Sequence, residues 1–167
     1  MTRVRATILL AFALPLLAAP AWAQTDAELE ENKRVAMEFF REGITAQERY
    51  DLLHDDYIQH NPAFKKFADE RGLSYKEGFL QRMTELMAAA GGAGGGADAD
   101  VPPPPPSNPY ELVLAEGDTV TVIQKRYVQD PNEPPGTYYE SFWFDTFRIR
   151  DGLLYEHWDG ALINPAN

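Results

Sequence analysis

The sequence contains no cysteine, which excludes a disulfide framework, a thiolate metal site and a cysteine nucleophile. Basic residues are few: 15 Lys and Arg stand against 26 Asp and Glu, giving a formal net charge of -11. Nucleic acid is bound through patches of Lys and Arg, so a chain this acidic, with no basic run, is not expected to bind it. The 44% of hydrophobic residues is enough for a packed core, which predicts one soluble domain rather than a disordered acidic chain.

The only long apolar run lies at the N-terminus. Residues 1–23 have the pattern of a secretory signal peptide, with arginines at the start, an apolar stretch, and Ala21 and Ala23 as the small residues of a cleavage site. The stretch is short and interrupted by prolines, which fits a cleaved signal better than a retained membrane anchor. We therefore predict cleavage after Ala23, a mature domain over 24–167, and a periplasmic or secreted protein with no membrane contact.

Capping patterns and helical periodicity predict three helices in the N-terminal half. Each begins near a residue whose side chain can cap it: Asp26, Thr45 with Glu48, and Ser74 with Glu77. Between the second and third helices, residues 57–60 favour a short strand, and Pro62 is expected to end it.

The C-terminal half is rich in β-forming residues separated by turn sequences. It predicts an antiparallel meander of four strands over 110–116, 119–129, 137–149 and 153–159. The segment 88–109 is glycine-rich and then contains five consecutive prolines, so it is expected to form a loop without packed structure. Helices followed by strands predict an α+β domain, with helices covering one face of a curved sheet.

Alternation along the last two strands places ionisable side chains on faces that are otherwise apolar. In the strand 137–149, Asp145 shares a face with aromatic residues, and in the strand 153–159, His157 and Asp159 share a face. An isolated carboxylate in an apolar environment is costly, so an acid on such a face is expected to be paired, to be protonated or to line a wet cavity. Such a cluster is a setting in which a carboxylate acts as a general base near neutral pH.

Structural roles and metal binding are alternatives at these positions. Asp145 could turn to solvent at a β-bulge, and Asp159 could simply end its strand before a turn. His60 could hydrogen-bond a turn, and His157 could be a core histidine with a satisfied hydrogen bond. Two histidines with two carboxylates are also a competent ligand set for a metal ion, although no histidine pair has helical spacing.

Two stretches carry a resemblance to a known family. They are Tyr57-Ile58-Gln59-His60-Asn61-Pro62 and the run from Phe144 to Asp159, and they resemble the SnoaL-like (polyketide cyclase-like) branch of the nuclear transport factor 2-like superfamily. The resemblance covers most of 27–164 apart from the Gly/Pro segment. It implies a cone-shaped α+β barrel, with N-terminal helices packed on a strongly curved, mainly antiparallel sheet, a pocket at one end, homodimerisation through the sheet, and no metal or organic cofactor.

The same resemblance implies roles for individual residues. In the cyclases of this family an acid just after the last-strand motif is the general base of an aldol closure, and Asp159 matches that position. The cyclases carry a histidine where this chain has Asp145, and the histidine of the Gln-His-Asn-Pro motif, His60, is expected to reach the cavity.

We therefore expect an exported, cofactor-free cyclase, lyase or isomerase acting on a small hydrophobic carbonyl compound. Asp159 would be the base, and His60 and His157 would orient it or stabilise an enolate. Asp145 would share a proton with Asp159 or fix a histidine tautomer. The pocket walls are expected to come from four aromatic residues: Tyr139, Trp143, Phe147 and Tyr155. A non-catalytic module of the same fold that holds a small apolar ligand is the alternative.

Overall fold

A computed structural model of the protein describes residues 25–93 and 101–160. Within these ranges the chain forms four helices and five strands. The predicted signal segment 1–23 lies outside the described residues, as does the middle of the predicted Gly/Pro loop. None of the described helices has the length and apolar character needed to span a bilayer.

Side-chain caps start the helices. The helices are α1 (Asp26–Glu38), α2 (Ala46–Asp51), α3 (Pro62–Arg71) and α4 (Tyr75–Ala93). Thr25, one residue before the predicted cap, forms a reciprocal capping box at α1, and Thr45 with Glu48 forms the predicted one at α2. At α4, Ser74 and Glu77 hydrogen-bond each other's backbone N–H groups. These bonds satisfy amide groups that a helix start otherwise leaves without partners.

Helix α3 was not predicted, because Pro62 was interpreted only as the end of a strand. Asn61 caps this helix: its Oδ1 accepts hydrogen bonds from the backbone N–H groups of Ala63 and Phe64. Proline is favoured in the first turn of a helix, where its missing N–H has no partner to lose. Asn followed by Pro is thus a helix-start signal that the sequence contained.

The helix before the predicted Gly/Pro loop and the strand after it both extend into the range predicted as loop. Helix α4 continues through two glycines to Ala93, and the next strand begins at Asn108, so the predicted loop boundaries of 88 and 109 were wrong. A glycine costs a helix only about 1 kcal/mol relative to alanine, which a long helix that is already formed can tolerate.

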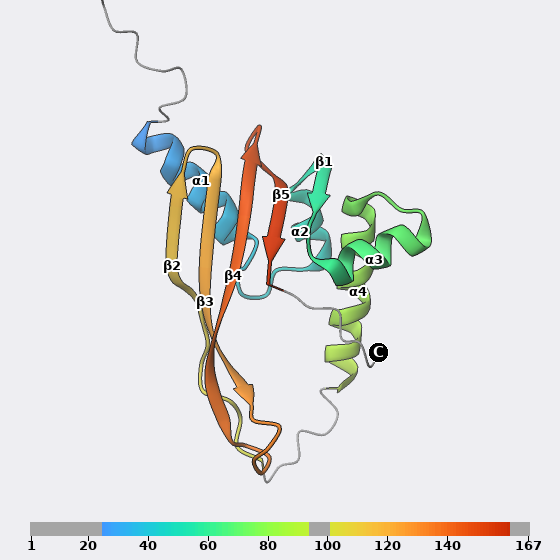
Figure 1. Ribbon diagram of the computed structural model, residues 1–167, viewed down its shortest axis with the longest axis vertical. Helices are drawn as coiled ribbons and strands as arrows, with labels where there is room; N and C mark the ends of the chain where they lie inside the picture. The colour runs from blue at the N-terminus through green and yellow to red at the C-terminus, as the bar shows by residue number, and fades with distance from the viewer. Residues whose placement is uncertain (1–24, 94–100, 161–167) are drawn as a thin grey trace, which may run out of the picture.

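The five strands form one sheet in the order β1-β5-β4-β3-β2 (Figure 1). They are β1 (Leu53–Gln59), β2 (Asn108–Glu116), β3 (Thr119–Gln129), β4 (Tyr138–Arg150) and β5 (Leu153–Asp159). Strands β2 to β5 form the predicted antiparallel meander, and β1 pairs with β5 in parallel. The structure confirms the α+β fold of N-terminal helices packed on a curved, mainly antiparallel sheet. The sheet is not closed within the described residues, because β1 and β2 are its two edges.

The hydrophobic core lies between the helices and the inner face of this sheet. Phe39, at the end of α1, packs against Phe79 of α4 and Phe147 of β4 with ring centroids 5.5 and 5.3 Å apart. The fully buried apolar side chains come mainly from the strands: Leu53, Val120, Val122, Phe147 and Leu154. The core-facing positions of β3 change from Val120 and Val122 to Gln124 and Arg126, so the interior becomes polar toward one end of the sheet.

Candidate functional site

The register of β4 and β5 brings two carboxyl groups and an imidazole together. Asp145 lies directly opposite Asp159, and Phe147 lies opposite His157. Because these residues alternate along their strands, all four side chains point to the inner face of the sheet. Asp145 and His157 are buried, at 8% and 4% exposure. The side chain of Asp159 is 20% exposed, so it can meet a molecule that enters from solvent.

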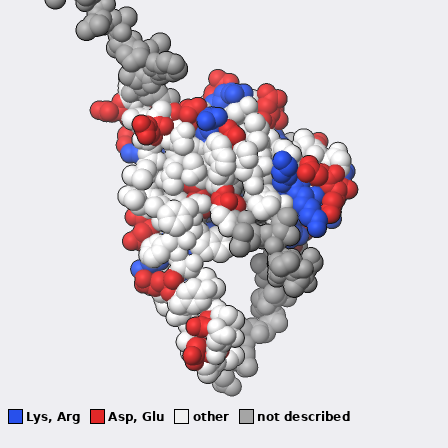
Figure 2. All heavy atoms as spheres, in the orientation of Figure 1, with Lys and Arg blue, Asp and Glu red and all other residues white. Residues whose placement is uncertain are grey.

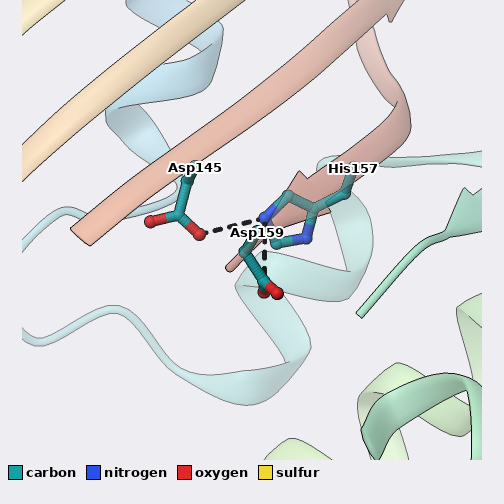
Figure 3. Close-up of side chains that lie close together, drawn as sticks. All are labelled: Asp145, His157 and Asp159. Carbon is teal, nitrogen blue, oxygen red and sulfur yellow. Dashed lines mark hydrogen bonds and ion pairs between the residues drawn. The ribbon is translucent and has the colours of Figure 1, made fainter. Parts of the chain in front are cut away.

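Both carboxyl groups approach the same nitrogen of His157 (Figure 3). Nε2 lies 3.0 Å from Asp145 Oδ1 and 3.9 Å from Asp159 Oδ2. The imidazole stacks on Phe147, with ring centroids 4.3 Å apart, and meets the edge of Phe39. The predicted pocket-wall residue Phe147 therefore lies beneath His157 and supports its ring instead of lining the cavity described below.

Hydrogen bonds from β1 determine which nitrogen of His157 carries hydrogen. The backbone N–H of Asn61 donates to Gln59 Oε1 at 2.9 Å, so the Gln59 amide nitrogen donates to Tyr57 Oη at 3.0 Å. With one lone pair taken by Gln59, the Tyr57 hydroxyl can donate its hydrogen to His157 Nδ1, 3.2 Å away. A neutral His157 accordingly carries its hydrogen on Nε2 and directs it at Asp145.

The Tyr57 hydroxyl keeps its proton over the whole ordinary pH range. Burial, followed by the negative charges of Asp159 and Asp145, raises the pKa of Tyr57 well above its usual value. The hydroxyl therefore contributes no pH dependence of its own there, and it can donate to His157 wherever Nδ1 carries no hydrogen.

Strand β3 holds Asp145 from the other side. Gln124 Nε2 donates to Asp145 Oδ2 at 2.7 Å, and Arg126 Nη2 donates to Gln124 Oε1 at 2.7 Å. With the Nε2–H of His157, the Asp145 carboxyl group accepts two hydrogen bonds, one on each oxygen. This is the bonding pattern of an ionised carboxylate.

Asn61 orients the second carboxyl group. Its Nδ2 lies 2.8 Å from each oxygen of Asp159, while its Oδ1 is held by the first turn of α3. Because the oxygen is committed to backbone N–H groups, the nitrogen must face Asp159. One asparagine thus starts a helix and positions a carboxylate.

Asn61 and the residues that fix the imidazole, Tyr57, Gln59 and Gln124, were not among the predicted site residues. For Asn61 the helix-start signal described above was available. For the others the sequence offers no signal, because a polar side chain at an alternate strand position gives the same sequence pattern whether it is buried or faces solvent.

His60 does not reach the interior, contrary to expectation. Its Nε2 lies 2.7 Å from Glu156 Oε1, and its ring stacks on Trp158 with centroids 4.9 Å apart. Glu156 and Trp158 alternate with His157 along β5, so they occupy the opposite face of the sheet. His60 is therefore removed from the predicted catalytic residues and from the candidate metal-ligand set.

Tyr155 does not share the face of His157 either. A β-bulge between Arg148 and Ile149 shifts the register of β5, and this breaks the two-residue alternation on which the prediction depended. The Tyr155 ring instead lies 5.5 Å from His54 and under the guanidinium of Arg150, at 3.3 Å.

A cavity of about 400 Å³ opens beside the two carboxyl groups. Its lining includes polar, charged and aromatic side chains: Asn61, Phe64, Arg126, Trp143, Asp145 and Asp159. Trp143 is therefore at the cavity wall, where the sequence placed it. Tyr139 lies six residues before Asp145 on β4, is 47% exposed, and is not in the lining.

Three side chains in this region could together contact a metal ion. One ligand atom each from Asp145, His157 and Asp159 lies within 4.8 Å of the others. A cation at Nε2 would have to replace the hydrogen that Tyr57 and Gln59 direct there. The hydrogen-bond arrangement therefore favours proton chemistry over metal ligation.

Comparison with known proteins gives only remote structural likeness. No family model and no curated protein matches the sequence. TsrD from Streptomyces laurentii is 18% identical with a TM-score of 0.47, over 82% of this chain and 90% of that chain. TerC, co-crystallised with polyporic acid, is 16% identical with a TM-score of 0.46, over 79% and 92%. A phenazine biosynthesis-related protein from Pseudomonas aeruginosa is 15% identical with a TM-score of 0.46, over 85% and 82%.

These similarities are too weak to carry an argument about the site. The chain's own elements, which are helices on a curved, mainly antiparallel sheet with a cavity beside its inner face, define an α+β protein with the architecture that the SnoaL-like resemblance implies.

The tautomer of His157 can be tested through Gln59. Gln59→Leu removes the group that makes Tyr57 a donor, so we expect His157 to change from one tautomer with hydrogen on Nε2 to a mixture. Long-range ¹H–¹⁵N NMR distinguishes these states. Gln47→Leu, on the exposed surface of α2, is the control and should leave the spectrum unchanged. An unaltered His157 signal in Gln59→Leu would show that Gln59 does not set the tautomer.

Proposed function

We propose that this protein is a cofactor-free acid/base enzyme that removes a proton from the carbon next to a carbonyl group of a small hydrophobic compound, with Asp159 as the base. The observation that supports this most is the position of Asp159. It lines the cavity, Asn61 holds both of its oxygens, and it lies next to the His157–Asp145 pair.

The proposed step conserves atoms and charge. Asp159 takes the proton, the electron pair of the broken C–H bond moves into the carbonyl group, and an enolate forms. If the enolate is reprotonated at another position, the enzyme is an isomerase. If it attacks a second carbonyl, the enzyme is a cyclase, and if it expels a neighbouring group, the enzyme is a lyase. Asp159 and Asp145 approach the same imidazole nitrogen. Proton uptake by Asp159 therefore also reduces the repulsion between the two carboxylates.

His157 acts through the carboxylates as a positioning residue. It is buried, it is not in the cavity lining, and its Nε2–H is directed at Asp145. It keeps the two carboxyl groups at a fixed separation. The stacked Phe147 ring holds the imidazole in the required plane.

A carrier that holds a ketone without chemistry is the alternative, because the cavity is partly walled by aromatic rings. Deuterium exchange separates the two. The enzyme should catalyse incorporation of deuterium from D₂O into the methyl group of acetophenone or a larger aryl methyl ketone, followed by NMR. A carrier would bind these ketones, and their methyl protons would exchange at the uncatalysed rate. That result would reject the proposal.

We also propose that the protein is a homodimer that pairs through the outer face of the sheet. Leu112, Ile123 and Phe144 are consecutive partners across three strands, and Phe144 is 55% exposed. Figure 2 shows that much of this view is uncharged, with a group of acidic side chains near its middle. Sedimentation velocity should show a dimer for the native protein and a monomer for Phe144→Asp, and a native monomer would contradict the proposal.

Export is the remaining part of the proposal. Residues 1–23 have the signal-peptide pattern described above, and the domain would act in the periplasm or outside the cell. N-terminal sequencing of the protein from its native source should begin at Gln24 if this is correct, and at or near Met1 if it is not.

A further inference from the structure

Arg126 is a cation at the wall of the cavity, in a protein whose net charge is -11. It lies on the inner face of β3, with its guanidinium 4.1 Å above the Trp143 ring. One nitrogen, Nη2, donates to Gln124 Oε1 at 2.7 Å. Within residues 25–93 and 101–160, the other N–H groups of this guanidinium make no hydrogen bond and no ion pair. Donors thus remain for a molecule in the cavity.

Gln124 lies between this cation and the carboxyl group of Asp145. Its amide nitrogen bonds to Asp145 and its oxygen accepts from Arg126. The charge of Arg126 is therefore not neutralised by direct contact. Burial lowers the pKa of Arg126, and the charge of Asp145 acts in the opposite direction, while an arginine stays protonated at neutral pH in either case.

A second arginine lies nearby. Arg49 of α2 has its guanidinium 5.4 Å from the Phe39 ring centroid, and its Nε is buried without a hydrogen-bond partner among the described residues. Its pKa is lowered first by burial and then by the charge of Arg126. The two half-buried cations repel each other, and neither forms an ion pair within the described chain. Such an arrangement costs folding free energy unless an anion offsets the charges.

We propose that Arg126 binds a carboxylate group of the substrate at the end of the cavity away from Asp159. This inference rests on the proposed function and names its substrate class: a small aromatic or conjugated keto acid. The planar guanidinium fork matches a carboxylate with two parallel hydrogen bonds, and the Trp143 ring keeps the fork in its plane.

The charge of the cavity favours a carboxylate over a phosphate. Asp145 and Asp159 line the same space, so each added negative charge is repelled, and a monoanion is repelled less than a dianion. The spacing favours an aromatic acid. The Arg126 guanidinium and the Asp145 carboxyl group are separated by one Gln124 amide and two hydrogen bonds of 2.7 Å, a separation that a compact planar acid can span.

The test uses 4-acetylbenzoate and its neutral analogue 4-acetylbenzamide. Each has the same enolisable methyl ketone, and only the first has a carboxylate. The native protein is titrated with both at constant ionic strength, and binding is followed by calorimetry and by the fluorescence of the tryptophans. We expect the acid to bind about tenfold to a hundredfold more tightly than the amide.

Arg126→Gln should remove this preference. It should weaken the binding of the acid by that factor and leave the affinity for the amide unchanged. Arg126→Lys retains the charge without the fork and should give an intermediate affinity, and it serves if Arg126→Gln does not fold. Arg82→Gln, at a partly exposed arginine of α4 that pairs with Glu85 and is not in the cavity lining, is the control and should bind like the native protein. Equal affinities for acid and amide in the native protein, or no binding of the acid, would overturn the inference.

Deuterium exchange of the same two probes distinguishes this inference from the proposed function. Exchange of both ketones at equal rates, unaffected by Arg126→Gln, would retain the enzyme and reject the carboxylate site. Binding of the acid that depends on Arg126, without exchange of either ketone, would retain the site and reject the base.

Discussion

Asp159→Asn is expected to lower the rate of proton abstraction by about 10² to 10⁴. Asparagine has nearly the same shape but cannot accept a proton on its oxygen under these conditions. One of its two polar atoms can still accept from Asn61, and the site is 20% exposed, so water can satisfy the other. The melting temperature should therefore change little. Deuterium exchange into an aryl methyl ketone, with thermal unfolding alongside, measures both quantities.

The control for this substitution is Asp55→Asn. Asp55 is 95% exposed, forms an ion pair with Lys76 on the surface, and is not in the cavity lining. Its replacement should leave deuterium exchange unchanged. Native exchange rates in Asp159→Asn would remove Asp159 as the base. A large loss of stability would mean that its role is structural.

Asp145→Leu is expected to destabilise the fold by about 3 to 5 kcal/mol. The substitution removes a buried acceptor, so the Nε2–H of His157 and the amide of Gln124 would lose their partner inside the protein. Equilibrium unfolding in urea gives the change in free energy. Asp55→Leu, at an exposed carboxylate, should stay within about 0.5 kcal/mol of the native protein. A loss below about 1 kcal/mol for Asp145→Leu would show that the network does not hold this part of the sheet.

Much of the fold could be predicted because local signals agreed with it. The strands 119–129 and 153–159 have the predicted bounds, and the capping box of Thr45 with Glu48 is present. The parallel pairing of β1 with β5 could not be predicted, because it depends on a contact between segments that lie far apart in sequence. It is also this pairing that brings Tyr57 to His157.

The site was predictable as far as strict alternation holds. Asp145 and Phe147 on one strand and His157 and Asp159 on the next lie on the inner face. Past the bulge the alternation fails, so Tyr155 was misplaced. His60 was misplaced for a different reason: its role was transferred from a resemblance, while its neighbour Asn61 is the residue that faces the interior.

The central claim is that Asp145 and Asp159 meet at one nitrogen of His157. The measurement that tests it most directly is the NMR signal of His157 Nε2–H in the native protein and in two variants, Asp145→Asn and Asp159→Asn, with Asp55→Asn as control. We expect hydrogen on Nε2, and a displacement of its signal by both substitutions but not by the control. A signal that Asp159→Asn leaves in place, or hydrogen on Nδ1 in the native protein, would contradict the account.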